Sequence, residues 1–136
     1  MFKTKAQNLK LLKKFFQNKK VDIPKFFYFT KKDFYKNKIF YLNKIKSEVL
    51  KNDIIIRSSA LSEDRSDKSC AGKYESRIFW RKKMKKLKHE IELFLRQLDR
   101  GNDEIIVQKF IKKVDIGGVI FTKDIKHNSP YYLINY

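Results

Sequence analysis

The residues best suited to chemistry come directly after the most strand-like segment of the sequence. Asp53–Ile56 ends in three isoleucines and is followed by the tripeptide Arg-Ser-Ser at 57–59. A basic side chain at the end of a buried strand is presented at a sheet edge, and small residues after it let backbone N–H groups turn toward an anion. The same spacing also fits a surface ion pair between Arg57 and Glu63 or Asp64. On spacing alone, both interpretations stay open.

A second candidate segment is Glu104–Thr122, in which an apolar run, a basic connector and a glycine pair follow one another. The pattern predicts two antiparallel strands, with Gly117 and Gly118 allowing close backbone approach. Gln108 interrupts the apolar run, and an amide there can hydrogen-bond the polar edge of a flat ring. Periodicity alone favours an ordinary, outward-facing strand residue at this position.

The remaining reactive side chains give weaker signals. His89 and His127 have no ligand-spaced companion, so both are predicted to be exposed surface histidines and no metal site is expected. Cys70 is the one cysteine, which excludes an intrachain disulfide and a cysteine-based zinc site. Trp80 lies beside basic residues and could stack a base, although a buried anchor or a cation–π contact is the simpler interpretation.

The elements that must position these residues alternate between helices and strands. Helices are predicted at Lys5–Asn18, with a stripe of Leu9, Leu12, Phe15 and Phe16, at Lys38–Leu50, and along a face of Met84, Leu87, Ile91, Phe94 and Leu98 that Gly101 ends. Strands are predicted at Phe26–Thr30, Asp53–Ile56, Lys73–Trp80, Glu104–Ile111, Gly117–Thr122 and Tyr131–Tyr136. Thr30 is predicted to cap a short helix together with Asp33. A long polar loop is predicted over Arg57–Gly72. This order predicts an α+β fold.

Composition bounds the class of protein. The chain has 136 residues, a length that suits about one domain, and 42% apolar residues, enough for a core. Its four glycines form neither a GxGxxG fingerprint nor a Walker-type phosphate loop. With 33 Lys and Arg against 15 Asp and Glu, the formal net charge is +18, and most of the basic residues are lysines. Such a field attracts polyanions, but A/T-rich codon bias explains a lysine excess equally well.

No export or membrane signal is evident in the sequence. Lysines interrupt the first sixteen residues, and the longest apolar runs are strand-sized. A basic amphipathic helix at the start could lie on a membrane surface, but docking on its own domain is the favoured interpretation. Together with the single thiol, these features predict a reducing, cytoplasmic location and no membrane partner.

Three blocks of the sequence resemble, in order, the nucleotide-binding domain of the pyruvate phosphate dikinase and phosphoenolpyruvate synthase family. IIIRSSALSEDRSDKSCAGKYES (Ile54–Ser76) is similar to the family's Arg-Ser-Ser-Ala signature loop, and EIIVQKFIKKVDIGGVIFTKD (Glu104–Asp124) to its Val-Gln-Lys-Met and Ser-Gly-Val-x-Phe-Thr segments. KAQNLKLL (Lys5–Leu12), followed by VDIPKFFYFT, resembles its opening helix and strand. The ending SPYYLINY is closer to the glutamine-kinase-like branch.

The resemblance implies an ATP-grasp-like fold and a role for particular residues. It implies that residues 1–136 are a partial nucleotide-binding domain, with about 1–103 as the first lobe and 104–136 as the inter-lobe strand and the start of the second lobe. Arg57 matches the arginine that stabilises the phosphoryl group in flight. The remaining matches are to ATP-binding positions: Lys5 to a phosphate-contacting lysine, Ser58 and Ser59 to the phosphate cover, and Gln108, Lys109, Phe110 and Ile111 to the strand that lines the adenine.

The resemblance also implies that some of the family's functional segments have no counterpart in residues 1–136. The family uses Mg²⁺, but its metal-binding acid and its Gln-x-Arg motif correspond to positions beyond Tyr136, and its phosphocarrier histidine has a setting that neither histidine here shares. Residues 76–86 depart from the family pattern as well. The expectation is therefore an ATP-binding portion of a phosphotransferase, inactive alone, as a gene fragment, a remnant, or a split subunit completed by a second chain.

The alternative is a small basic protein that binds nucleic acid. The lysine excess and the aromatic residues favour it, whereas the scarcity of arginine and the even spread of lysines argue against a specific motif. Under the first interpretation, nucleic acid would bind only non-specifically. A third possibility is a pseudoenzyme that only binds a partner.

Overall fold

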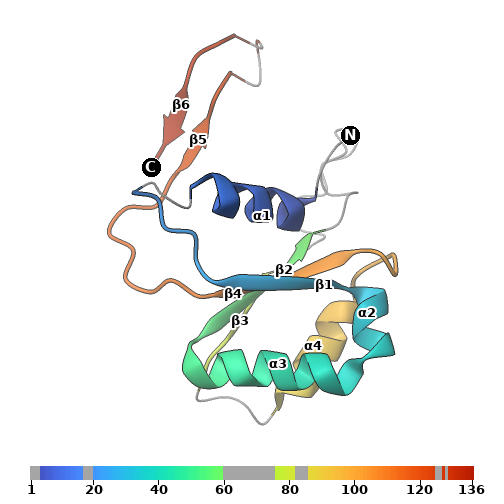
Figure 1. Ribbon diagram of the computed structural model, residues 1–136. Helices are drawn as coiled ribbons and strands as arrows, with labels where there is room; N and C mark the ends of the chain where they lie inside the picture. The colour runs from blue at the N-terminus through green and yellow to red at the C-terminus, as the bar shows by residue number, and fades with distance from the viewer. Residues whose placement is uncertain (1–3, 17–19, 60–75, 82–85, 125–126, 128) are drawn as a thin grey trace.

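The chain forms a mixed α+β fold around a four-stranded antiparallel sheet (Figure 1). The computed structural model describes residues 4–16, 20–59, 76–81, 86–124, 127 and 129–136. Within them lie α1 (Lys5–Phe15), β1 (Phe26–Thr30), α2 (Lys31–Lys36), α3 (Lys38–Lys51), β2 (Ile54–Ser59), β3 (Ser76–Phe79), α4 (Leu87–Arg96), β4 (Glu104–Lys109), β5 (Val119–Phe121) and β6 (Leu133–Asn135). The sheet has the order β1-β4-β2-β3, and β5 and β6 form a separate ribbon.

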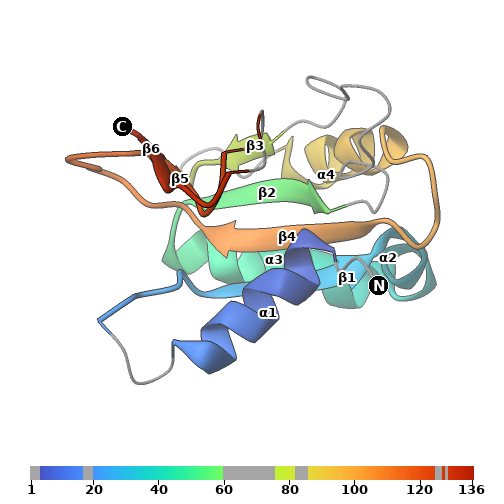
Figure 2. The same ribbon diagram turned by 90° about the horizontal axis from the view of Figure 1, so that it is seen from above.

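Helices cover the sheet unequally on its two faces. Of the described helices, α2, α3 and α4 lie on one face and α1 crosses the other (Figures 1 and 2). Opposed residues in a sheet share a face and successive residues alternate between faces. Ile105 and Val107 of β4 therefore join Ile56 of β2 and Phe29 of β1 on the side of α2, α3 and α4. The main hydrophobic core lies there.

The amphipathic pattern of α4 is confirmed, but its end is not. Leu87, Ile91, Phe94 and Leu98 are all buried in the core, as their spacing predicts. The helix ends at Arg96 rather than near Gly101, because the N–H groups of residues 97 and 98 donate to the carbonyls of residues 94 and 95 and tighten the last turn. A turn over 97–103 then leads into β4.

The capping prediction at Thr30 is also confirmed. The Thr30 hydroxyl accepts the N–H of Asp33 at 3.0 Å, and the Asp33 carboxylate accepts the N–H of Thr30 at 3.3 Å. These bonds lower the pKa of Asp33, the side chain of Thr30 being the largest cause. The reciprocal bonds let β1 pass directly into α2 without a loop.

α1 forms where the sequence predicts it, but its apolar stripe does not become a core face. The only described buried side chain of the helix itself is Ala6, whereas Phe15 is 66% exposed and Leu12 is also exposed. The first turn of the helix is hydrogen-bonded to the sheet, and the helix then runs obliquely across it (Figure 2). In the later turns, Leu9 and Phe16 of the stripe are half-buried and Lys13 lies over the ring of Phe26 in β1, so the stripe is covered only in part.

The pairing of the last strands differs from the prediction. The sequence suggested that Glu104–Ile111 and Gly117–Thr122 form one antiparallel pair, but β4 pairs with β1 and β2 and β5 pairs with β6. Both edges of β4 are already occupied, so β5 has no free edge there. The close approach expected at the glycine pair is found at Gly118, where an added Cβ would lie 2.4 Å from the carbonyl oxygen of Asn135.

The β5–β6 ribbon extends away from the four-stranded sheet (Figure 1). Ile120 opposes Ile134 on one face of the ribbon, and Phe121 opposes Leu133 on the other. Apolar side chains of both faces are exposed, and Tyr136 is exposed beside them. Among the described helices, none is long and apolar enough to cross a membrane.

Candidate functional site

Arg57 and Gln108 lie on the same face of the sheet, on neighbouring strands. Arg57 of β2 opposes Ile106 of β4, and Gln108 of β4 opposes Ile55 of β2. Both side chains therefore point to the face that α1 crosses, two residues apart along the strands. Arg57 is exposed and Gln108 is half-buried, so both can reach a ligand on this face.

The start of α1 is fixed to the same face by two buried polar contacts. The Ala6 N–H donates to the Ser59 hydroxyl at 2.9 Å, and the Thr4 hydroxyl donates to the Glu104 carboxylate. Ser59 and Glu104 oppose each other across β2 and β4, so the two contacts lie side by side. Lys5, between the two anchored residues, is thereby held against the end of the sheet face that carries Arg57.

Not all of the predicted site residues reach this face. Successive residues of a strand point to opposite faces, so Ser58 faces the main core, where it opposes Ile105 and is buried. Lys109 points to the same side as Ser58, and Phe110 and Ile111 lie beyond the end of β4. Residues 57–59 also belong to β2 rather than to the loop predicted from Arg57, because their backbone pairs with β4 to the last residue of β2.

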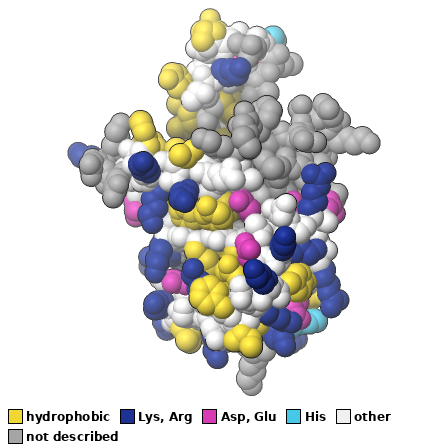
Figure 3. All heavy atoms as spheres, turned by 45° about the vertical axis from the view of Figure 1, so that its right-hand side comes forward, with side chains coloured by type: hydrophobic (Ala, Val, Ile, Leu, Met, Phe, Trp, Pro, Cys, Tyr) yellow, Lys and Arg dark blue, Asp and Glu magenta, His cyan; other side chains and the backbone are white. Residues whose placement is uncertain are grey.

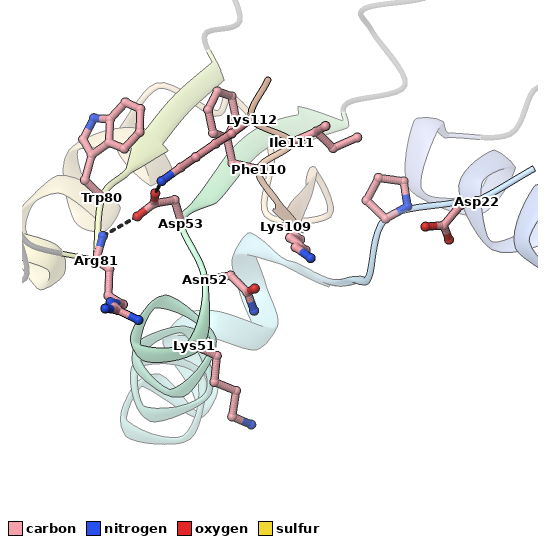
Figure 4. A pocket seen from close by; sticks show the side chains of 11 residues that line it. Asp22, Lys51, Asn52, Asp53, Trp80, Arg81, Lys109, Phe110, Ile111 and Lys112 are labelled. Carbon is pink, nitrogen blue, oxygen red and sulfur yellow. Dashed lines mark hydrogen bonds and ion pairs between the residues drawn. The ribbon is translucent and has the colours of Figure 1, made fainter. Parts of the chain in front are cut away.

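A hollow of about 1080 Å³ opens where β2 begins and β4 ends (Figure 4). We call it the end-of-sheet hollow. It is lined by Asp22, Pro24, Lys51, Asn52, Asp53, Trp80, Arg81, Lys109, Phe110, Ile111 and Lys112. A smaller hollow of about 190 Å³ shares Asn52 and Lys109 with it and also includes Gln108. The predicted adenine segment thus runs from the sheet face into this region.

Asp53 organises the polar contacts of the end-of-sheet hollow. One carboxylate oxygen accepts the Arg81 N–H at 2.7 Å, and the other forms an ion pair with Lys112 (Figure 4). The Arg81 N–H and then Lys112 lower the pKa of Asp53. Lys112 also lies over the indole of Trp80, 5.4 Å from the ring centroid, which confirms a cation–π contact for that residue.

The pKa of Asp53 makes the arrangement at Lys112 dependent on pH. A depressed carboxyl pKa means that the ion pair contributes stability above the ordinary aspartate value of 3.8 and that this contribution is lost as the pH falls through the lower, folded value. Trp80 is the one tryptophan, and Lys112 lies over its ring, so we expect its fluorescence to change in that pH range. A fluorescence titration measures this, and Asp53→Asn should abolish the transition; its persistence in that variant would exclude Asp53 as its source.

Sequence reasoning missed Asp53, Lys112 and the position of Trp80 at one site. Asp53 was predicted only as the start of a strand, and the residues that contact it are far away along the chain. They meet because β2 pairs with both β3 and β4, which brings the ends of these strands together. Spacing in a sequence carries no signal for such contacts.

Some predictions fall outside the described residues. These are the loop at 60–75, with Glu63, Asp64 and Cys70, and the helix position Met84. His89 and His127 are exposed, as predicted, and His127 contacts Asp124 at 2.7 Å. Within the described part of the chain, no group of three His, Cys, Asp or Glu residues is placed to hold a metal ion.

Comparison of this chain with protein-family models, with curated proteins and with solved structures finds no match.

Proposed function

We propose that this chain is the ATP-binding portion of a cytoplasmic phosphotransferase with an ATP-grasp-like fold, of the pyruvate phosphate dikinase and phosphoenolpyruvate synthase type. In this proposal, about 1–103 form the first lobe, and 104–136 form the inter-lobe strand and the start of the second. The observation that carries it is the common sheet face of Arg57, Ser59 and Gln108, with Lys5 held beside them.

The phosphate end of the ligand would lie at Lys5 and Arg57. The first N–H groups of α1 are already used, since that of Ala6 donates to Ser59 and that of Gln7 to Thr4. Binding of phosphate therefore falls to the two cationic side chains rather than to the helix end. Phosphoryl transfer depends mainly on positioning and on neutralisation of charge, which such side chains supply.

The ring end of the ligand would lie toward Gln108 and Phe110. Arg57 opposes Ile106, and Phe110 lies four residues further along β4 and its extension, or about 13 Å at the rise of a strand. The amide of Gln108 lies between these two ends on the same face. A nucleotide lying along β4 thus has cations at one end and apolar side chains at the other.

The described residues do not fit the Mg²⁺ ion that the proposed family uses. Glu104 is an acidic residue on this sheet face, and its carboxylate is engaged by the Thr4 hydroxyl. No step is therefore assigned to a metal in this chain. In the proposal, a second chain supplies the metal ligands and the acceptor site, so this chain alone binds ATP without transferring its phosphate.

Equilibrium dialysis with ATP tests the proposal. Arg57→Ala removes a charge-assisted contact worth about 1.5–3 kcal/mol, so we expect ATP affinity to fall about 10- to 100-fold. Arg96→Ala is the matched control, because Arg96 lies on α4, on the opposite side of the sheet. Adenosine, which lacks phosphates, should bind both variants equally.

Two results would overturn the proposal in different ways. Equal ATP affinity of the two arginine variants would remove Arg57 from the phosphate site. Absence of saturable ATP binding by the unmodified chain at moderate salt would remove the nucleotide site itself.

A further inference from the structure

We propose that the end-of-sheet hollow binds single-stranded nucleic acid, with one base stacked on Trp80 and the phosphates held by the cations around it. The site does not include Arg57 or the phosphate end proposed above, although Phe110 belongs both to it and to the ring end of the proposed ATP site. Its ligand chemistry, a flat ring joined to phosphate, is shared by a mononucleotide and a single strand, and three observations favour the strand.

The first observation is an aromatic platform that is both fixed and accessible. Trp80 is 42% exposed, and its ring meets that of Phe110 edge to face, with the centroids 5.7 Å apart. Phe110 is itself fixed, because its N–H donates to the Asp53 carbonyl at 2.8 Å. Stacking on an exposed indole tolerates any base, which suits binding without sequence preference.

The second observation is the placement of the cations. Lys51 comes from the end of α3, Arg81 follows β3, and Lys109 ends β4, so their side chains reach the hollow from different elements (Figure 4). Cations separated in this way can contact successive phosphates rather than grip one. Asp53 opposes them little, because both of its oxygens are already engaged.

Lys112 can move to accommodate a base. Its ammonium lies over the Trp80 ring, where a base would stack, but its side chain is 56% exposed. A base that takes this place displaces the ammonium from the ring face while Lys112 keeps its ion pair with Asp53. The present cation–π contact shows that the ring face is reachable.

The third observation is the volume of the hollow together with the net positive charge of the chain. At about 1080 Å³ the hollow is at the upper limit of small-molecule sites, which run to roughly 1000 Å³. The net charge of +18 attracts a ligand with many phosphates more strongly than one with few. Basic side chains are also scattered over the viewed side of the body (Figure 3), so diffuse surface binding is the competing outcome that a test must separate.

Fluorescence of Trp80 reports occupancy directly, since it is the one tryptophan. We expect a short oligothymidylate of about 10 nucleotides to quench it saturably. If three phosphates are contacted, affinity should fall roughly 20-fold between about 50 mM and 200 mM salt. Oligonucleotide binding without any response of Trp80 would place the ligand elsewhere and overturn the proposal.

Variants then locate the site, with anisotropy of a dye-labelled oligothymidylate as the readout. Lys51→Ala should lower affinity about 5-fold or more and reduce the salt dependence by one contact. Lys46→Ala, which removes an exposed lysine from the same helix outside the hollow, should change affinity less than 2-fold. Trp80→Ala should lower affinity about 10-fold, through loss of stacking.

The outcomes also separate this proposal from the ATP proposal. Arg57→Ala should lower the affinity for ATP and leave the affinity for the oligonucleotide unchanged. Lys51→Ala should lower the affinity for the oligonucleotide and leave the affinity for ATP unchanged. Equal losses of oligonucleotide from Lys51→Ala and Lys46→Ala would show diffuse binding and overturn the proposal. Equal losses of ATP and oligonucleotide from Lys51→Ala would show a mononucleotide site and overturn it as well.

Discussion

Phe34→Ala is expected to lower the free energy of unfolding by about 3–5 kcal/mol. Phe34 has no exposed surface and comes from the short helix α2, where it stacks with Phe29 at 6.0 Å between ring centroids. Tyr41 of α3 lies 6.4 Å away, so the ring joins a strand and two helices. Its loss leaves a cavity that these aromatic neighbours cannot fill without leaving their own contacts.

Urea denaturation measures this change. Phe40→Ala is the matched control, because Phe40 lies on α3 and is 59% exposed; its loss should cost less than about 1 kcal/mol. Domains of this kind are stable by about 5–15 kcal/mol in total, so a loss of this size leaves a domain at the lower end of that range partly unfolded even without urea. Equal effects of the two substitutions would contradict the position of Phe34 in the core.

Ser59→Ala is expected to release the start of α1 from the sheet. The substitution leaves the buried N–H of Ala6 without its acceptor, at a cost of about 1–3 kcal/mol. Because Lys5 immediately precedes Ala6, its position beside Arg57 should be lost as well. Hydrogen exchange at the Ala6 amide should accelerate selectively, and ATP affinity should fall with it.

Ser47→Ala provides the comparison for Ser59. The Ser47 hydroxyl donates to the Lys44 carbonyl on an exposed face of α3, so its removal should change stability by less than about 0.5 kcal/mol. Unchanged exchange at Ala6 in Ser59→Ala would show that other contacts hold α1 in place.

The elements with strong local patterns could be predicted from the sequence. The apolar run of β1, the capping pair at Thr30 and Asp33 and the apolar face of α4 each depend on residues a few positions apart. Local periodicity reports whether an element can bury one side, and in α4 the buried side is the one that it predicts. The α+β class follows from the order of those elements.

Pairing and docking could not be predicted in the same way. Nothing in the residues of β4 shows that β1 and β2 will occupy both of its edges, and this alone excludes β5 from it. The stripe of α1 also looked like a core face, yet two polar contacts at its first turn decide where the helix docks. Both errors arise because long-range geometry overrides a correct local pattern.

The candidate site also has a part that could be predicted from local sequence and a part that depends on long-range pairing. A strand that leads into Arg57 could be found from sequence, and so could an amide inside the apolar run at Gln108. The end-of-sheet hollow could not, because Asp53, Arg81 and Lys112 meet there only after β2 pairs with its two neighbours. A site at the ends of several strands becomes visible only when the register is known.

The exposed β5–β6 ribbon has a practical consequence for handling the protein. Among the described strands, β5 and β6 pair only with each other, and Ile120, Ile134 and Tyr136 are exposed beside their outer edges, the kind of surface on which strands of separate molecules assemble. Electrostatic repulsion between like-charged copies opposes that assembly, and concentrated salt weakens the repulsion. Association through the ribbon should therefore be weakest in buffers of low ionic strength near neutral pH and should increase as salt is added.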